Sequence, residues 1–338
     1  MATHPDSEHS ENTATTVTVF GFPFDDTDAD IILRSSDRVD FMVYKVILSK
    51  ASPVFKDMFS LPQPATETSQ DSRPIVDLTE NSKVLAALLS TIYPHTSASD
   101  DPLSLNDLIA VLDMARKYDM ATASRRLLVV FTDSKALKDS PLEAFCVAYS
   151  RGLGDAARVA AKASLKLRLT LDDIGEKLQY TNGPAFHRLW KYHRACSAAA
   201  TRAVSVRNFK WISPALTTWW WSATSASCRC SKFQFTLGTE GSSWLANSSW
   251  NDYLDRARNA LREQPCSEAV TTQAVLRPSY QAVMCAECRQ RICGLSEFSR
   301  YLGEEVERVV SEVREARTSF LISSLTLIFV EVPLDLPF

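Results

Sequence analysis

The fold is decided by the stretch Asp30–Phe59, which reads DIILRSSDRVDFMVYKVILSKASPVFKDMF. Its first half predicts a β-hairpin, because an apolar run at 31–33 and an alternating run at 39–43 flank a Ser-Ser-Asp turn. Its second half predicts short helices, since Ser52 is a good N-cap and Pro53 occupies the first helical position, where a missing N–H costs nothing. The expected buried stripe of the second helix is Val54, Phe55, Met58 and Phe59.

The same stretch resembles the BTB/POZ family, and its fungal branch in particular. The matching signature consists of Asp30, Phe41, Tyr44, Lys45, Leu48, Ser52, Phe55, Met58 and Phe59. Tyr44 stands where the family usually has a histidine, a departure that we expect to matter little if the ring is a packing element. The resemblance covers residues 28–130. It implies an α+β fold class, in which a small sheet covered by helices is followed by a mostly helical C-terminal region.

The resemblance also implies an interaction module and not an enzyme. BTB domains typically form two-fold homodimers, and the interface expected here lies in Val17–Leu33 and Leu48–Phe59. We therefore predict a non-enzymatic scaffold that self-associates and binds another protein. The alternative is a substrate adaptor of a cullin-RING ubiquitin ligase, with a cullin as partner. Cullin-binding members resemble one another in a hydrophobic-x-Glu sequence just after Met-Phe, whereas Met58-Phe59 is followed here by Ser-Leu-Pro.

Length and composition limit the other classes of function. A chain of 338 residues suggests about two domains, and 37 basic against 40 acidic residues give no general attraction to nucleic acid or anionic membrane. Residues 1–16 lack the basic and apolar parts of a signal peptide, so we expect a protein that is intracellular, cytoplasmic or nuclear, and not secreted. The apolar tract 320–330 is too short for a membrane span, which needs about 20 residues.

Changes in pattern divide the chain into six parts. We predict a disordered N-terminus at 1–16, the BTB/POZ domain at 17–135, a helical extension similar to the BACK region at 136–205, a Cys/Trp-rich region of undefined fold at 206–295, an amphipathic helix at 296–317 and an apolar tail at 318–338. In the extension, a Ser-Pro-Leu-Glu capping box starts a helix at Ser140 and Asp155 caps the next one. A later helix at 184–200 has the candidate buried residues Phe186, Leu189, Trp190 and Tyr192.

One group of cysteines has metal-ligand spacing. Cys228-x-Cys230 and Cys285-x-x-Cys288 can close a tetrahedral structural zinc site, with Cys293, His193 or Cys196 as spare ligands. Because Zn–S bonds of about 2.3 Å place the sulfurs about 3.8 Å apart, this hypothesis requires them to converge. Cys-x-Cys is less usual than Cys-x-x-Cys, so unligated cysteines are the commoner outcome. A redox Cys-x-x-Cys would need a thioredoxin-like βαβ setting, which the neighbouring sequence does not show.

The remaining motifs have ordinary explanations. The G-x-G-x-x-A sequence at 152–157 follows a capped helix and not a strand, so it predicts a helix C-cap and a turn rather than a dinucleotide site. Residues 151–210 hold twelve basic and four acidic residues, an excess of +8, which solvated helix faces usually explain better than nucleic-acid binding. No nucleophile–base pair or cofactor loop is present, which leaves a thiol-dependent enzyme as a third, less favoured class. No cofactor other than the zinc ion is expected.

Overall fold

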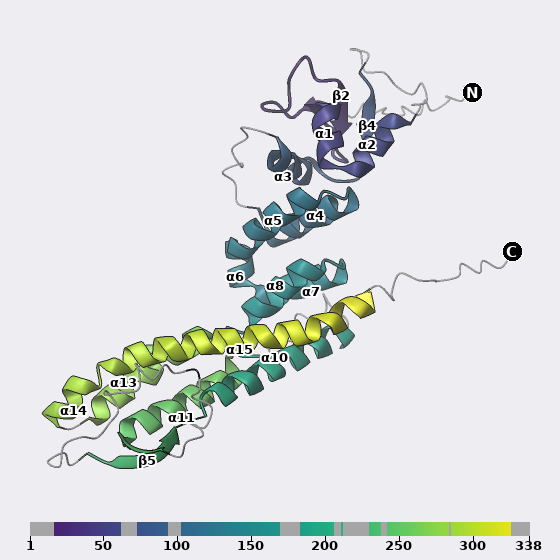
Figure 1. Cartoon of the computed structure of the whole chain (residues 1–338). Coiled ribbons are helices and arrows are strands. Elements are labelled where there is room, and N and C mark those ends of the chain that lie inside the picture. The colour runs from purple at the N-terminus through teal and green to yellow at the C-terminus, as the bar shows by residue number, and fades with distance from the viewer. Residues whose placement is uncertain are drawn as a thin grey trace, which may run out of the picture. The chain divides into compact units, whose positions relative to one another are not determined.

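The computed structural model describes residues 17–61, 73–93, 103–169, 183–205, 211, 230–237, 242–283 and 285–325, with the backbone alone at 235–237, 242–244 and 314–325. The chain divides into two compact units between Leu137 and Lys138 (Figure 1). The division falls two residues after the end predicted for the BTB/POZ domain. The predicted disordered segment 1–16 lies outside the described residues.

Unit 1, up to Leu137, contains a mixed four-stranded sheet in the order β1-β3-β2-β4. Its strands are β1 (Thr18–Val19), β2 (Ile31–Arg34), β3 (Val39–Val43) and β4 (Ile75–Asp77). β2 and β3 are antiparallel, with Leu33 opposite Phe41, which confirms the predicted hairpin. β1 joins β3 and β4 joins β2 in parallel, so β1 and β4 are the two edges of the sheet.

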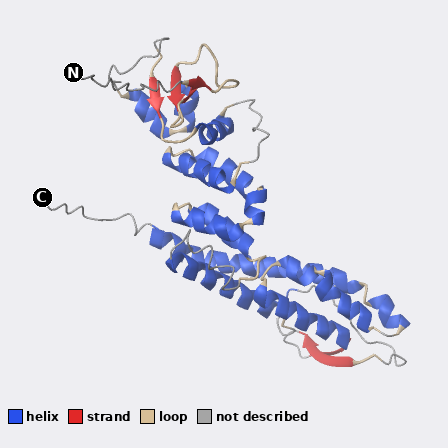
Figure 2. Ribbon diagram, turned by 180° about the vertical axis from the view of Figure 1, so that it is seen from behind, coloured by secondary structure: helices blue, strands red, loops and turns tan. Residues whose placement is uncertain are grey.

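Helices lie beside this sheet (Figure 2). Unit 1 contains α1 (Lys45–Ala51), α2 (Pro53–Ser60), α3 (Ser82–Ile92), α4 (Leu105–Lys117) and α5 (Ala121–Asp133), and the short α6 (Lys135–Asp139) spans the division between the two units. At several helix starts, a side chain accepts a hydrogen bond from one of the first backbone N–H groups, which have no acceptor within the helix. Ser52 caps α2, Asn81 caps α3, and Ser104 with Asp107 forms a capping box at α4. The predicted sheet covered by helices is confirmed.

The strand pattern differs from a simple alternation at one residue. Asp40 in β3 is buried, although the period predicts that it faces away from the core beside Met42. Its carboxylate accepts two hydrogen bonds from the Arg34 guanidinium, at 2.7 and 2.9 Å. A buried charge is tolerated when it is paired and hydrogen-bonded in this bidentate way. The pairing with Arg34 on the neighbouring strand therefore allows Asp40 to be buried.

Unit 2 is mostly helical. It contains α7 (Pro141–Ser150), α8 (Gly154–Ser164), α10 (Gly183–Ala203), α11 (Ser248–Glu263), α12 (Ser267–Thr271), α13 (Gln273–Ala282), α14 (Ala286–Arg291) and α15 (Gly294–Leu325). An antiparallel hairpin of β5 (Lys232–Leu237) and β6 (Ser242–Asn247) precedes α11. The long helix α15 lies alongside α10, as both views show (Figures 1 and 2). An α+β unit followed by a helical region is the predicted fold class.

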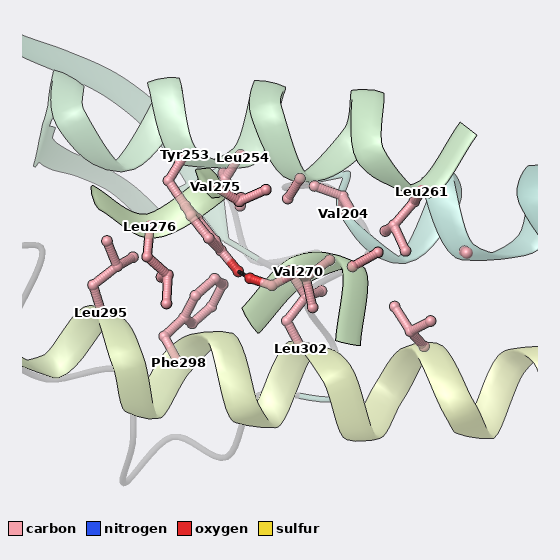
Figure 3. Packing of buried hydrophobic residues seen from close by; sticks show 14 of the residues in the cluster. Val204, Tyr253, Leu254, Leu261, Val270, Val275, Leu276, Leu295, Phe298 and Leu302 are labelled. Atoms are coloured by element: carbon pink, nitrogen blue, oxygen red, sulfur yellow. Dashed lines mark hydrogen bonds between the residues drawn. The ribbon is translucent and has the colours of Figure 1, made fainter. Parts of the chain in front are cut away.

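The core of unit 2 forms where α10, α11, α12, α13 and α15 meet (Figure 3). Tyr253 is fully buried there, and its hydroxyl donates a hydrogen bond to the Val270 carbonyl at 3.1 Å. On the amphipathic helix predicted at 296–317, Phe298, Leu302, Val306 and Val310 are all buried. These helices therefore bury a continuous apolar interior, and α15 supplies one of its sides.

Several local predictions in unit 2 need correction. Ser140 precedes α7 as predicted, but its side chain makes no cap hydrogen bond. Asp155 lies inside the first turn of α8, and Leu153 is the N-cap residue. On α10 only Leu189 of the four candidates is buried, since small alanines occupy most of the core-facing positions. Gly152, by contrast, ends α7 at φ 69°, the left-handed conformation that a C-cap glycine adopts.

The C-terminal apolar tract continues a helix. The backbone of α15 runs to Leu325, and residues 326–338 lie outside the described residues. The first part of the tract 320–330 is therefore the end of this helix and not a separate strand. In the part of the chain that the structure describes, no helix is both long enough and apolar enough to cross a membrane.

Candidate functional site

Four of the nine signature residues lie in the interior of unit 1. Phe41, Leu48, Ser52 and Phe55 are buried, so they hold the fold and do not form its surface. The Ser52 hydroxyl accepts the Phe55 N–H at 3.0 Å and donates to the Tyr118 carbonyl at 2.5 Å, which ties the start of α2 to the end of α4. The Phe55 and Tyr118 rings stack with their centroids 4.6 Å apart. These buried residues stabilise the local fold. A partner protein therefore has to contact other residues of unit 1.

Tyr44 has a polar role that the sequence did not indicate. Its hydroxyl donates to a carboxylate oxygen of Asp28 at 2.6 Å, and a carboxylate oxygen of Asp26 lies 3.2 Å away. The hydrogen bond to Asp28 and the nearby negative charges raise the pKa of Tyr44, because they disfavour the phenolate. The residue that replaces the family's histidine is thus a hydrogen-bond donor to an acidic pair. The cluster of four aspartates at 25–30 was the signal that could have suggested it.

The other signature residues lie at or near the surface of unit 1. Asp30 is exposed, and its carboxylate accepts the backbone N–H of Lys45 at 2.7 Å, which satisfies the first donor of α1. Met58 and Phe59 are half-buried, and the Phe59 ring lies 5.8 Å from that of Phe55. The signature as a whole therefore positions the β2–β3 hairpin, α1 and α2 relative to one another.

Exposed apolar side chains are concentrated on the first elements of unit 1. Seven of the ten large exposed apolar residues in the described chain lie between residues 17 and 61; they are Val17, Val19, Phe20, Phe22, Val46, Val54 and Leu61. We call these seven residues the exposed apolar set. Phe22 is 84% exposed, and four members belong to β1 and the residues beside it. Five of the seven fall inside the two segments in which the interface was predicted.

Three of the four predicted zinc ligands converge. The sulfur atoms of Cys230, Cys285 and Cys288 all lie within 4.8 Å of one another, and all three residues are half-buried. Cys230 precedes β5, whereas Cys285 is the N-cap of α14 and Cys288 lies in that helix. The Cys285 sulfur accepts the Cys288 N–H at 3.3 Å. Cys228, the fourth predicted ligand, lies outside the described residues.

The spare ligands are not part of this group. Cys293 is exposed, and its thiol donates to the Gln290 carbonyl at 2.9 Å. Cys196 is buried in the core of unit 2, and His193 lies one turn before it on α10. The setting of Cys285 and Cys288 also differs from a redox motif, since α13 and not a strand precedes them. Among the described residues, the three converging cysteines are the one group with metal-ligand geometry.

Ion pairs with acids elsewhere in unit 2 offset part of the basic character of residues 151–210. Lys162 pairs with Glu307 on α15 at 3.1 Å, and Arg168 pairs with Glu263 on α11 at 2.9 Å. Lys166 pairs with Glu268 on α12. The three acids lie far away in the sequence, so the local count of +8 overstates the positive charge that this part of the surface carries.

A cavity of about 600 Å³ lies between α10, the end of α11 and residues 168–169, which follow α8. Its lining includes His193, Ser197, Arg194, Arg262 and Trp190. The Ser197 hydroxyl donates to the Arg262 carbonyl at 3.1 Å, so it is not set up as a nucleophile with His193 as its base. Burial lowers the pKa of His193, while a hydrogen bond to the Ser164 backbone partly offsets this effect. The arrangement gives no support to hydrolytic chemistry.

Comparison with known proteins agrees with the fold of unit 1. Residues 24–133 match the family model of the BTB/POZ domain, which spans β2 to α5. A comparison with curated proteins gives no match. The placement in the fungal branch stays a prediction. Sequence match, sheet and helix order agree, and residues 24–133 of this chain are therefore a BTB/POZ domain, a protein-interaction module, followed by a helical C-terminal region.

Proposed function

We propose that this protein is a non-enzymatic scaffold that self-associates through its BTB/POZ domain and binds a second protein through the remainder of the chain. The observation that carries the proposal is the exposed apolar set on the first elements of that domain. Single exposed apolar residues are ordinary, but a concentration of them on a few neighbouring elements favours an interaction surface.

The position of β1 supports self-association. It is an edge strand that uses one side to pair with β3, and Val19 on it is exposed. An edge strand with apolar side chains is prone to pair with another chain unless a partner covers it. A second copy of the protein offers the same edge and the same apolar side chains, so a two-fold contact would bury both sets at once.

Sedimentation of the full-length protein tests this proposal. We expect a species of twice the monomer mass of 37.7 kDa at tens of micromolar. Val19→Glu should weaken the dimer at least tenfold, because it places a charge in the proposed apolar contact at the β1 edge. Val130→Glu is the matched control, since Val19 and Val130 are both 52% exposed valines and Val130 lies on α5, outside the exposed apolar set. A wild-type monomer at this concentration, or equal effects of both variants, would contradict the proposal.

A further inference from the structure

We propose that Cys230, Cys285 and Cys288 bind a zinc ion that joins the β5–β6 hairpin to α14. The three thiol groups come from two segments that are 55 residues apart in the sequence, yet their sulfurs lie within 4.8 Å of one another. Sulfur ligands of one tetrahedral zinc ion lie about 3.8 Å apart, so each pair has to move closer by about 1 Å at most. Three soft thiolate ligands select zinc over magnesium or calcium.

The hydrogen bond at the start of α14 favours the same assignment. The Cys285 sulfur accepts the Cys288 N–H at 3.3 Å, and the Arg289 N–H donates to the Cys285 carbonyl at 3.0 Å. This turn places the two Cys-x-x-Cys sulfurs on one side of the helix start. Hydrogen bonds of this kind to a ligand atom hold it in place and orient it toward a shared ion.

Packing around the three cysteines gives the site a rigid frame. Cys288 packs against the core of unit 2, and Val283 and Ile292, which flank α14, are both buried. On the other side, Phe233 of β5 lies three residues after Cys230, and its ring lies 5.7 Å from that of the buried Trp250. Both halves of the site are thus anchored in the same core. A metal ion between them would hold a hairpin that has only two strands, too few to be stable alone.

The role that follows is structural. A disulfide could join two of the three sulfurs but would leave the third without a function, whereas a metal ion uses all three. The site lies apart from the cavity lined by His193, in whose lining no cysteine is found among the described residues. Zinc binding would therefore stabilise unit 2 and leave the BTB/POZ domain unaffected.

Zinc analysis of the full-length protein, purified under reducing conditions without chelator, tests the site. We expect about one equivalent of zinc in the wild type and less than half in Cys230→Ser, Cys285→Ser and Cys288→Ser. Cys293→Ser is the control, because this exposed cysteine lies close in sequence but outside the cluster, and it should retain the wild-type zinc content. Less than half an equivalent in the wild type, or an equal loss in Cys293→Ser, would overturn the proposal.

A second measurement on the wild type avoids variants that fail to fold. Cobalt(II) exchanged into the protein should show the charge-transfer absorption of thiolate ligands, and a spectrum of oxygen and nitrogen ligands alone would overturn the proposal. Removing zinc with a chelator should raise hydrogen exchange at 230–237 and 285–291 and leave the exchange of unit 1 unchanged. Unchanged exchange in the two cysteine segments would contradict the structural role.

Discussion

At the residue scale, single polar side chains hold the BTB/POZ domain together at points where the backbone would otherwise be unsatisfied. Ser52 is the clearest case, because its buried hydroxyl both caps α2 and bonds to the Tyr118 carbonyl. Asp30 acts in the same way at the start of α1, where it accepts the Lys45 N–H, whereas the Tyr44 hydroxyl donates to the Asp28 carboxylate in the acidic segment before β2. These contacts connect elements that are distant in the sequence, and each involves a signature residue.

Ser52→Ala should destabilise unit 1 by about 1–3 kcal/mol, because it removes the N-cap and leaves buried backbone groups without their partner. Ser60→Ala on the same helix is the control, and it should change the stability by less than about 0.5 kcal/mol, since Ser60 is exposed. All seven tryptophans lie in unit 2, so fluorescence does not report on unit 1. Hydrogen exchange of unit 1 peptides in increasing urea measures the effect, and equal values for the two variants would refute this role of Ser52.

At the element scale, α10 brings a titratable group into the interior of unit 2. Burial lowers the pKa of His193 below its ordinary value of 6.5. The unfolded chain therefore binds more protons than the folded one once the pH falls below 6.5, so the contribution of His193 is fully present above this pH and is lost below it. Arg168, Arg194, Arg262 and Glu263 line the cavity next to His193 and are the charged groups that surround it.

Unit 2 should lose stability between pH 7.5 and 5.5, with a contribution from His193 of no more than about 1.4 kcal/mol per pH unit. His193→Gln should flatten this dependence, because the residue no longer titrates. His187→Gln, at an exposed position of the same helix, should keep the wild-type slope. Urea unfolding at each pH, followed by tryptophan fluorescence, measures the stability of unit 2. A wild-type slope in His193→Gln would show that other groups cause the pH dependence.

At the scale of the whole molecule, the chain combines an interaction module with a larger helical unit that has its own core. Each unit buries its own apolar residues, and the cysteine cluster and the cavity both belong to unit 2. Self-association through unit 1 and metal binding in unit 2 can therefore be tested separately, because a variant in one unit leaves the core of the other intact.

We expect no binding of the full-length protein to a cullin N-terminal domain at micromolar concentration. In this chain Met58-Phe59 leads into Ser60 and the exposed Leu61, and the glutamate that cullin-binding members have in this region is missing. Size-exclusion chromatography tests for co-elution of the two proteins. A cullin-binding BTB protein is the positive control. A stable complex would favour the adaptor function over the scaffold.

Features that depend on neighbours within about one helical turn were predictable from the amino-acid sequence alone. They include the β2–β3 hairpin, the Ser52 cap, the Gly152 helix end and the amphipathic helix that contains Phe298, since strand period, cap chemistry and helix period are local. The β5–β6 hairpin was missed, although Phe233 and Phe235 alternate with polar residues and the sequence Gly-Thr-Glu-Gly follows, a pattern that could have indicated it.

Contacts between segments that are distant in the sequence became apparent in the folded structure alone. The burial of Asp40, the carboxylate partners of Tyr44 and the approach of Cys230 to Cys285 each depend on how whole elements pack. A spacing of cysteines shows that a shared site is geometrically allowed, but the path of the 55 residues between them determines whether it forms. The sequence therefore determined which side chains were available for a zinc site, and the packing of unit 2 decided that three of them meet.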